Sequence, residues 1–518
     1  MSSHPPFAFL SPVPCLATLA VFGLLSCTDP GATADEPTGG STAEPSSTGD
    51  PGDPGDPDNP SETGDPSGTG DPGDPSDPGD PSETGDPSET GAPSETSAPS
   101  ETSETGETGE TGEEPTFEEL SADVDRELEP DISPEALEVM RKGGVDLGFK
   151  LLREVADTAG GNLAVSAFSL RSAFAMVLAM ARGETAEEIV ASLGFPLDPE
   201  QAHKAMNHVD LALEARNLPE TESDDPLIIA TANRVFVKPT AIVGQGFLET
   251  LALNYGAGVY LADFGSDPKG VSDKINAWVA DRTRDRIPEL FPPDVIQAAT
   301  AWVLVNAVYL KAPWAMQFDP GQTSARPFTT LDGGKTDVPT MHSNELYGLY
   351  GQGEGYRFVD LPLRGGELSV TLIVPDEGKF SEVEAWLGAD TLDVMLDAAQ
   401  SGDLEVYLPK FKVTTGSMSL TDPLKALGMN VPFLGSADLS GMSDGGDYNP
   451  PPISFVYQSV FVAMDEAGVE AAAATGVGGD DSEPVPEFTL EVNRPFLFLI
   501  RDRPTGSVPF TGRVLDPT

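Results

Sequence analysis

Near the C-terminus, an apolar, strand-like stretch at 455–464 runs directly into a segment made almost entirely of small residues. This segment, Asp465 to Thr475, reads DEAGVEAAAAT. Four consecutive alanines favour a helix, but glycines stand on both sides of them, at Gly468 and Gly476. Because so few side chains obstruct backbone pairing, the segment could be threaded between two existing strands. The sequence therefore predicts a long exposed loop whose stem can join a β-sheet.

The order of residues in this segment agrees with such an insertion. Side chains of a strand point alternately to the two faces of a sheet. One set is Val469, Ala471, Ala473 and Thr475, and the other is Glu470, Ala472, Ala474 and Gly476. The only charge is in the second set, so we expect Val469 to face the core and Glu470 to remain in water. The alternative interpretation is an ordinary alanine-rich linker or a short helix.

The segment resembles the hinge of the serpins, a family of protease inhibitors whose members read EEG, a small residue and EAAAAT at this place. Insertion of the serpin loop into a sheet is a known form of strand addition. The resemblance implies a hinge made of Glu466, Gly468, Val469, Glu470, Ala471, Ala472, Ala473, Ala474 and Thr475.

Other segments match the same family, in family order, over roughly 370 residues. They include TANRVFV at 231–237, VLVNAVYL at 303–310, VYLPKFK at 406–412 and RPFLFLI at 494–500. The resemblance implies an α+β serpin fold with three β-sheets, eight or nine helices and an exposed reactive-centre loop near the C-terminus.

The resemblance also implies a region at which the main sheet opens. Its expected members are Asn162, Ser166, Ser169, Asn276, Asn306, Trp314 and Gln458. Gln458 stands where the family has a histidine, and its amide can hydrogen-bond with Asn306 or Ser166.

In mechanism, the resemblance implies a suicide substrate of serine-type, or cysteine-type, endopeptidases. The protease attacks one peptide bond of the loop, and the hinge then inserts into the main sheet and distorts the protease's catalytic groups. Gly476, Gly478 and Gly479 would weaken an inserted strand by about 0.5–1 kcal/mol each. The alternative is therefore a non-inhibitory serpin-fold module, with a binding or structural role, tethered at the cell surface.

The attacked bond can be located by two counts. Family spacing of about sixteen residues from Glu466 gives residue 482, whereas counting back from Pro495 gives Pro484, and proline disfavours cleavage on either side. The candidates are therefore Ser482 and Glu483, with Asp480 and Asp481 as alternatives.

Nothing in the sequence indicates catalysis by this chain. Residues 125–518 contain three histidines, His203, His208 and His342, no cysteine and no G-x-S-x-G motif. We expect His203 and His208 to lie on the surface. No enzymatic activity, cofactor or metal is expected.

Composition divides the 518 residues into two parts. Residues 1–120 contain 26 acidic residues and no lysine or arginine, and the remainder contains 59 acidic and 29 basic residues. Residues 27–124 are rich in Pro, Gly, Ser, Thr and acids, with too little apolar surface to fold, so we expect a disordered spacer before a serpin domain at 125–518.

Within that domain, a helix is expected over 133–156 with a break at Gly143-Gly144. The acidic balance and the lack of a basic cluster argue against nucleic acid and against a heparin-like activator, and we expect a monomer.

The N-terminus resembles the signal peptide of a bacterial lipoprotein. Residues 7–25 are mostly apolar and lead into Leu24-Leu25-Ser26-Cys27. The resemblance implies cleavage after residue 26, lipidation of Cys27 and an extracellular or cell-surface protein held to a bacterial membrane. A simple secretory signal and an uncleaved anchor remain alternatives, because no Lys or Arg precedes the apolar run and Pro12 and Pro14 interrupt it.

Overall fold

A computed structural model of the chain describes residues 117–196, 198–221, 224–470 and 485–518. The signal peptide, Cys27, most of the expected spacer, Ala471 to Thr475 and the candidate reactive-bond residues 480–483 lie outside the described residues.

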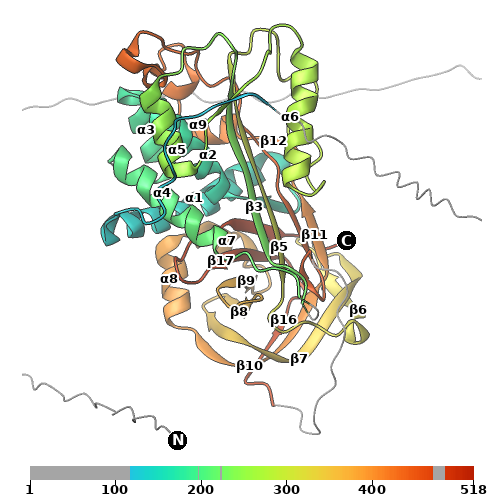
Figure 1. Cartoon of the computed structure of the whole chain (residues 1–518). Coiled ribbons are helices and arrows are strands. Elements are labelled where there is room, and N and C mark those ends of the chain that lie inside the picture. The colour runs from blue at the N-terminus through green and yellow to red at the C-terminus, as the bar shows by residue number, and fades with distance from the viewer. Residues whose placement is uncertain (1–116, 197, 222–223, 471–484) are drawn as a thin grey trace, which may run out of the picture. The chain divides into compact units, whose positions relative to one another are not determined.

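The main sheet has seven strands, with β3 and β5 as its longest members (Figure 1). Across the sheet the strands are β1 (Glu119–Leu120), β4 (Val259–Leu261), β3 (Ile228–Val237), β5 (Trp302–Pro313), β15 (Gly468–Val469), β14 (Phe461–Met464) and β11 (Phe411–Thr414). Strands β3 and β5 pair antiparallel over their whole common length. Strand β5 is an almost continuous apolar run because both of its faces are buried.

The second sheet has nine strands. These are β16 (Phe488–Glu491), β10 (Gln400–Pro409), β7 (Lys335–Gly353), β8 (Tyr356–Pro362), β9 (Leu368–Pro375), β17 (Phe496–Asp502), β18 (Phe510–Val514) and β2 (Leu163–Val165), with β6 (Ser324–Thr329) paired to β7. A third, two-stranded sheet joins β12 (Met418–Ser419) to β13 (Tyr457–Gln458).

Nine α-helices accompany these sheets in the described residues. They are α1 (Pro134–Ala159), α2 (Ala167–Met180), α3 (Gly183–Leu193), α4 (Pro199–Glu214), α5 (Gln245–Tyr255), α6 (Pro268–Arg282), α7 (Phe380–Trp386), α8 (Ala389–Asp397) and α9 (Thr421–Ala426). The predicted α+β architecture, with three sheets and eight or nine helices, is confirmed.

The helices cover both faces of the main sheet. Helix α2, which is buried along almost its whole length, packs in the large core together with Leu304, Val308 and Leu310 of β5. Helix α6 forms a second core on the opposite face, with Val305 and Ala307 of the same strand. Figure 1 shows α6 on one side of β3 and β5 and helices α2 to α5 on the other. A strand that entered next to β5 would therefore meet packed side chains on both faces.

Helix α1 is continuous, so the expected break at Gly143-Gly144 is wrong. Both glycines permit close approaches. A Cβ at Gly143 would lie 2.0 Å from the carbonyl oxygen of Gly194, and a Cβ at Gly144 would lie 2.5 Å from Nη1 of Arg171. The two glycines are therefore needed because other groups pack closely against this side of the helix. The helix tolerates their low intrinsic helix propensity.

The folded part begins before residue 125. Strand β1 pairs antiparallel with β4, and Phe117 stacks on Tyr260 with ring centroids 5.7 Å apart. Residues 117–124, which the sequence assigned to the spacer, thus add an edge strand to the main sheet. Because this segment contains several acidic residues, its sequence pattern did not distinguish it from the spacer. Among the helices in the described ranges, none has the length and apolar character needed to cross a bilayer.

Candidate functional site

Strand β15, the start of the predicted hinge, occupies a gap between β5 and β14. It runs antiparallel to both, with Gly468 opposite Pro313 and Val469 opposite Ala312. On its other side, Val469 is opposite Met464. Further along, β5 meets the segment just before β14 directly, through an isolated parallel bridge between Ala307 and Ser459. The main sheet is therefore open to the hinge at one end and closed beyond it.

The residue types at 468 and 469 suit this narrow gap. Gly468 has φ of 142°, and a Cβ there would lie 2.4 Å from the carbonyl oxygen of Ala312. Val469 is fully buried and belongs to the large core, as its place in the alternation predicted. A glycine is thus required where the two backbones approach, and the first side chain of the hinge already contributes to the core.

Glu466 fastens the base of the hinge. Its carboxylate pairs with Nζ of Lys410 at 2.6 Å and accepts a hydrogen bond from the Thr323 hydroxyl at 2.6 Å. Burial opposes ionisation of this carboxyl, but the hydrogen bonds from Lys410 and Thr323 outweigh it, and the pKa of Glu466 lies below its usual value. The backbone carbonyl of Glu466 also accepts from the amide of Phe318.

Trp314, at the end of β5, fastens the same turn. Its indole Nε1 donates to the carbonyl of Asp465 at 2.9 Å, and its backbone amide donates to the carbonyl of Ala467 at 3.0 Å. Burial raises the pKa of Asp465, whose carboxylate accepts from the amide of Ala467. The site thus holds the hinge through both side-chain and backbone contacts.

A buried polar cluster lies next to the Ala307–Ser459 bridge, where the main sheet is closed. Gln458 accepts from the amide of Ser166 at 3.0 Å, and its Nε2 donates to the carbonyl of Ser166 and to Oδ1 of Asn306. Asn306 in turn donates to Ser169 and to Oδ1 of Asn233. The expected bonding of the glutamine is therefore present with both partners. This network links the last residue of β13 to the start of α2 and to the middle of β5.

Two residues assigned to this region lie elsewhere. Asn162 accepts from the amides of Leu515 and Asp516 and so ties β2 to the C-terminal segment. Asn276, on α6, accepts from the amides of Leu290 and Phe291 and holds the loop that follows the helix. Asn162 and Asn276 were assigned to the sheet-opening region because they match family motifs. A motif match does not show how far apart residues lie in space.

That loop carries the partner of Glu470. Arg286 forms an ion pair with the Glu470 carboxylate, whose side chain is only 11% exposed. The expectation that Glu470 remains in water is therefore wrong. The pKa of Tyr309, on β5, is raised to about 12, chiefly by burial and secondly by the negative charge of the Glu470 carboxylate. Glu470 also has φ of 52°, in the left-handed region that non-glycine residues rarely adopt. The chain thus turns out of the strand directly after Val469.

Several contributors were not identified from the sequence. Lys410, Tyr309 and Asn233 lie within the segments VYLPKFK, VLVNAVYL and TANRVFV, which indicated strands but no role for these residues. Thr323 and Arg286 carried no pattern at all. The expectation of two surface histidines is wrong for one of them. His203 is buried, its Nδ1 lies 2.6 Å from the hydroxyl of Tyr255, and burial lowers its pKa to about 4.

Comparison with known proteins identifies the family. The model of the family Serpin (serine protease inhibitor) matches residues 143–517. The chain is 31% identical over 372 residues to the leukocyte elastase inhibitor of Bos taurus, covering 69% of this chain and 93% of that protein. It is 33% identical over 365 residues to a serine protease inhibitor of Cyanea capillata, covering 69% and 92%. The chain therefore belongs to the serpin family.

Solved serpin structures share this fold. The thermophilic serpin tengpin in the native state superposes with a TM-score of 0.65 at 26% identity, covering 77% of this chain and 97% of that one. Thyroxine-binding globulin in complex with thyroxine gives a TM-score of 0.64 at 26% identity, covering 73% and 99%.

We predict that Glu466→Gln lowers the melting temperature at pH 7 but not in acid. Because the folded pKa of Glu466 is depressed, the carboxylate contributes stability above its unfolded pKa and loses this contribution as the pH falls through the folded pKa. The expected difference at neutral pH is on the order of 1 kcal/mol. It should disappear in acid, once the pH has fallen below the folded pKa. Glu382→Gln, which removes an exposed pair with Lys379, is the control and should change little at either pH. Equal melting temperatures of parent and Glu466→Gln at pH 7 would contradict this assignment.

We predict that Arg286→Ala loosens the first inserted residues. The amide of Glu470 donates to the carbonyl of Ala463 at 3.0 Å, so hydrogen exchange at Glu470 reports whether this pairing persists. Loss of a half-exposed ion pair worth at most about 1 kcal/mol should accelerate this exchange about three- to fivefold. Arg282→Ala removes an arginine that lies over Trp278, in the same part of the chain, and should leave the exchange unchanged. Equal acceleration in both variants would show that Arg286 acts only through the overall charge.

Proposed function

We propose that this chain inhibits serine-type endopeptidases as a suicide substrate, through insertion of its cleaved loop into the main sheet. The observation that carries the proposal is the position of Gly468 and Val469 between β5 and β14. Two of the relatives named above are protease inhibitors by name, which supports the same function.

The register of β15 defines where the rest of the hinge would go. Because Val469 is opposite Ala312 and the strands are antiparallel, continued pairing would bring Ala471 opposite Leu310 and Ala473 opposite Val308. Both of these β5 residues lie in the large core, on the same face as Val469. Each added alanine would therefore bury apolar surface against an existing core.

The other set of hinge residues would face α6. In the same register Ala472 would lie opposite Tyr309 and Ala474 opposite Ala307, which packs in the second core under α6. Only small side chains could enter this space without displacing the helix, because protein cores have no voids of that size. The alanines of the second set satisfy this requirement, and Glu470 at the entrance keeps its charge near Arg286.

Insertion requires that β5 separates from the chain around Ser459, which it now contacts directly. The Ala307–Ser459 bridge and the Gln458–Asn306 hydrogen bond would both be broken before Ala474 could pair. In the intact chain the loop leads into β16, which pairs with β10, and cleavage would release the hinge from this attachment. After the protease has formed an acyl-enzyme with the loop, the freed hinge can insert and carry the protease with it. Displacement of the catalytic groups by even 1 Å would slow deacylation about 10²-fold.

We predict that purified protein forms an SDS-stable complex with at least one member of a panel of serine and cysteine proteases. Val469→Arg should abolish the complex while leaving the loop cleavable by the same protease, because a charge would have to enter the core. Val394→Arg, at an exposed position on α8, is the control and should retain complex formation. Cleavage of the parent by every protease without any complex would overturn the proposal and indicate a non-inhibitory module.

We further propose that the protein is lipid-anchored at the cell surface through Cys27. The support is the apolar run at 7–25 followed by Leu24-Leu25-Ser26-Cys27. A flexible spacer of roughly 90 residues would give a root-mean-square reach on the order of 55 Å. The serpin domain, as a monomer, would then meet proteases away from the membrane.

We predict that Cys27→Ser moves the protein from the detergent phase to the aqueous phase in Triton X-114 partitioning of expressing bacterial cells. Cys15→Ser, within the apolar run, is the matched control and should leave partitioning unchanged. Partitioning of both variants with the parent into the detergent phase would favour an uncleaved anchor. An aqueous parent protein would favour a simple secretory signal.

A further inference from the structure

A pocket of about 280 Å³ lies away from the hinge, between α1, α2, α4 and the turn that joins β17 to β18. Most of its wall is apolar. The apolar lining includes Leu137, Met140, Phe168, Met206, Val209 and Val508. Its volume suits a small organic molecule, and none of the hinge residues contributes to it.

Arg171, on α2, lines the same pocket and is only 4% exposed. Its Nη1 donates to the carbonyl of Met140 at 2.7 Å, and its Nη2 donates to the carbonyl of Gly194 at 2.9 Å. The guanidinium also lies over the ring of Phe195, 5.0 Å from the centroid. All of these partners are neutral, so the positive charge is not compensated.

One donor nitrogen of Arg171 is unused. Its Nε is buried and has no hydrogen-bond partner among the described residues. Burial lowers the pKa of Arg171 to about 9, and no carboxylate counteracts it. A buried cation without a counter-ion costs several kcal/mol in typical proteins. The other two buried arginines in the described ranges each meet a carboxylate, Arg501 with Asp360 and Arg513 with Glu384.

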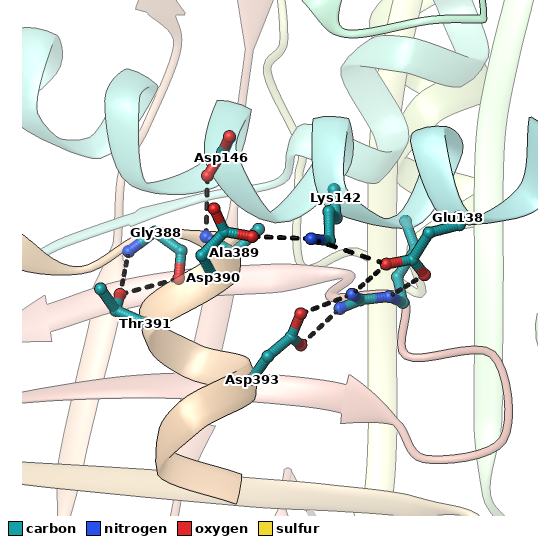
Figure 2. Close-up of polar contacts among 9 residues, drawn as sticks. Glu138, Lys142, Asp146, Gly388, Ala389, Asp390, Thr391 and Asp393 are labelled. Carbon is teal, nitrogen blue, oxygen red and sulfur yellow. Dashed lines mark hydrogen bonds and ion pairs between the residues drawn. The ribbon is translucent and has the colours of Figure 1, made fainter. Parts of the chain in front are cut away.

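The second arginine of the pocket is already neutralised. Arg141 makes paired hydrogen bonds to Glu138 and to Asp393 of α8. Lys142 extends this network to Asp390, as Figure 2 shows along the contact of α1 with α8. Glu138, the one carboxylate among the described residues that line the pocket, is therefore held by Arg141 and Lys142 and is not available to Arg171.

Gly144 shows that the chain provides space for this guanidinium. A Cβ at residue 144 would lie 2.5 Å from Nη1 of Arg171, so any larger residue would displace the arginine. The glycine pair that interrupts the helical sequence pattern of α1 thus positions a buried cation at an apolar pocket.

We propose that this pocket binds a small amphipathic monocarboxylate. Its carboxylate would neutralise Arg171, and its apolar tail would lie among Leu137, Met206 and Val209. Charge complementarity identifies the head group and the apolar wall identifies the tail. The site is separate from the inhibitory hinge and adds a ligand-binding capacity to this serpin.

The test is isothermal titration of the full-length protein with octanoate and with 1-octanol, which has the same number of carbon atoms and no charge. We expect saturable 1:1 binding of octanoate, at least tenfold tighter than that of 1-octanol. Equal affinities for the two compounds, or no saturable binding of octanoate at millimolar concentration, would overturn the proposal without any variant.

Two variants and a control then locate the site. Arg171→Met should weaken octanoate binding at least tenfold and leave 1-octanol binding unchanged. It should change the melting temperature little, because relief of the unpaired buried charge offsets the loss of hydrogen bonds to the carbonyls of Met140 and Gly194. Leu137→Trp, which narrows the pocket without touching Arg171, should weaken both compounds. Arg282→Met, on α6, removes an equal charge elsewhere and should change neither affinity.

The proposal is contradicted if Arg171→Met binds octanoate as tightly as the parent protein, because the binding site would then lie elsewhere. If Arg171→Met does not fold, unaltered octanoate affinity in Leu137→Trp has the same meaning.

Discussion

Strand β5 is separated from β14 by the two residues of β15 and meets the chain just before β14 at a single bridge, and the other features of the site depend on this. At one end Gly468 and Val469 already lie between the two strands. A few residues further on, β5 meets the segment just before β14 through the Ala307–Ser459 bridge. A sheet that already admits the first two residues of a hinge has a defined path for the next ones. The same path is blocked until the closed part separates.

Polar contacts hold this arrangement on both sides of the opening. Lys410 and Thr323 fix Glu466 before the inserted residues, and Arg286 holds Glu470 after them. Beneath the closed part, Gln458 is satisfied by groups of α2 and β5. Each of these contacts is local, so each can be weakened without unfolding the domain. Contacts of this kind agree with the proposed rearrangement, in which the hinge inserts further after cleavage.

The sequence predicted the class of fold and the burial of Val469, because both follow from local pattern. Family segments in the correct order identified the architecture, and simple alternation placed Val469 in the core. Contacts between distant residues could not be predicted in this way. Glu470 and Arg286 are 184 positions apart, and no spacing rule connects them. The glycine pair in α1 suggested a broken helix, since its packing partners, Gly194 and Arg171, become visible only in three dimensions.

The most direct test is a crystal structure of the domain after its loop has been nicked by a protease that it does not inhibit. We predict a new central strand between β5 and β14, with Ala471 opposite Leu310 and Thr475 opposite Asn306, and with the Ala307–Ser459 bridge broken. A nicked form in which that bridge persists, with nothing added beyond Val469, would contradict the account.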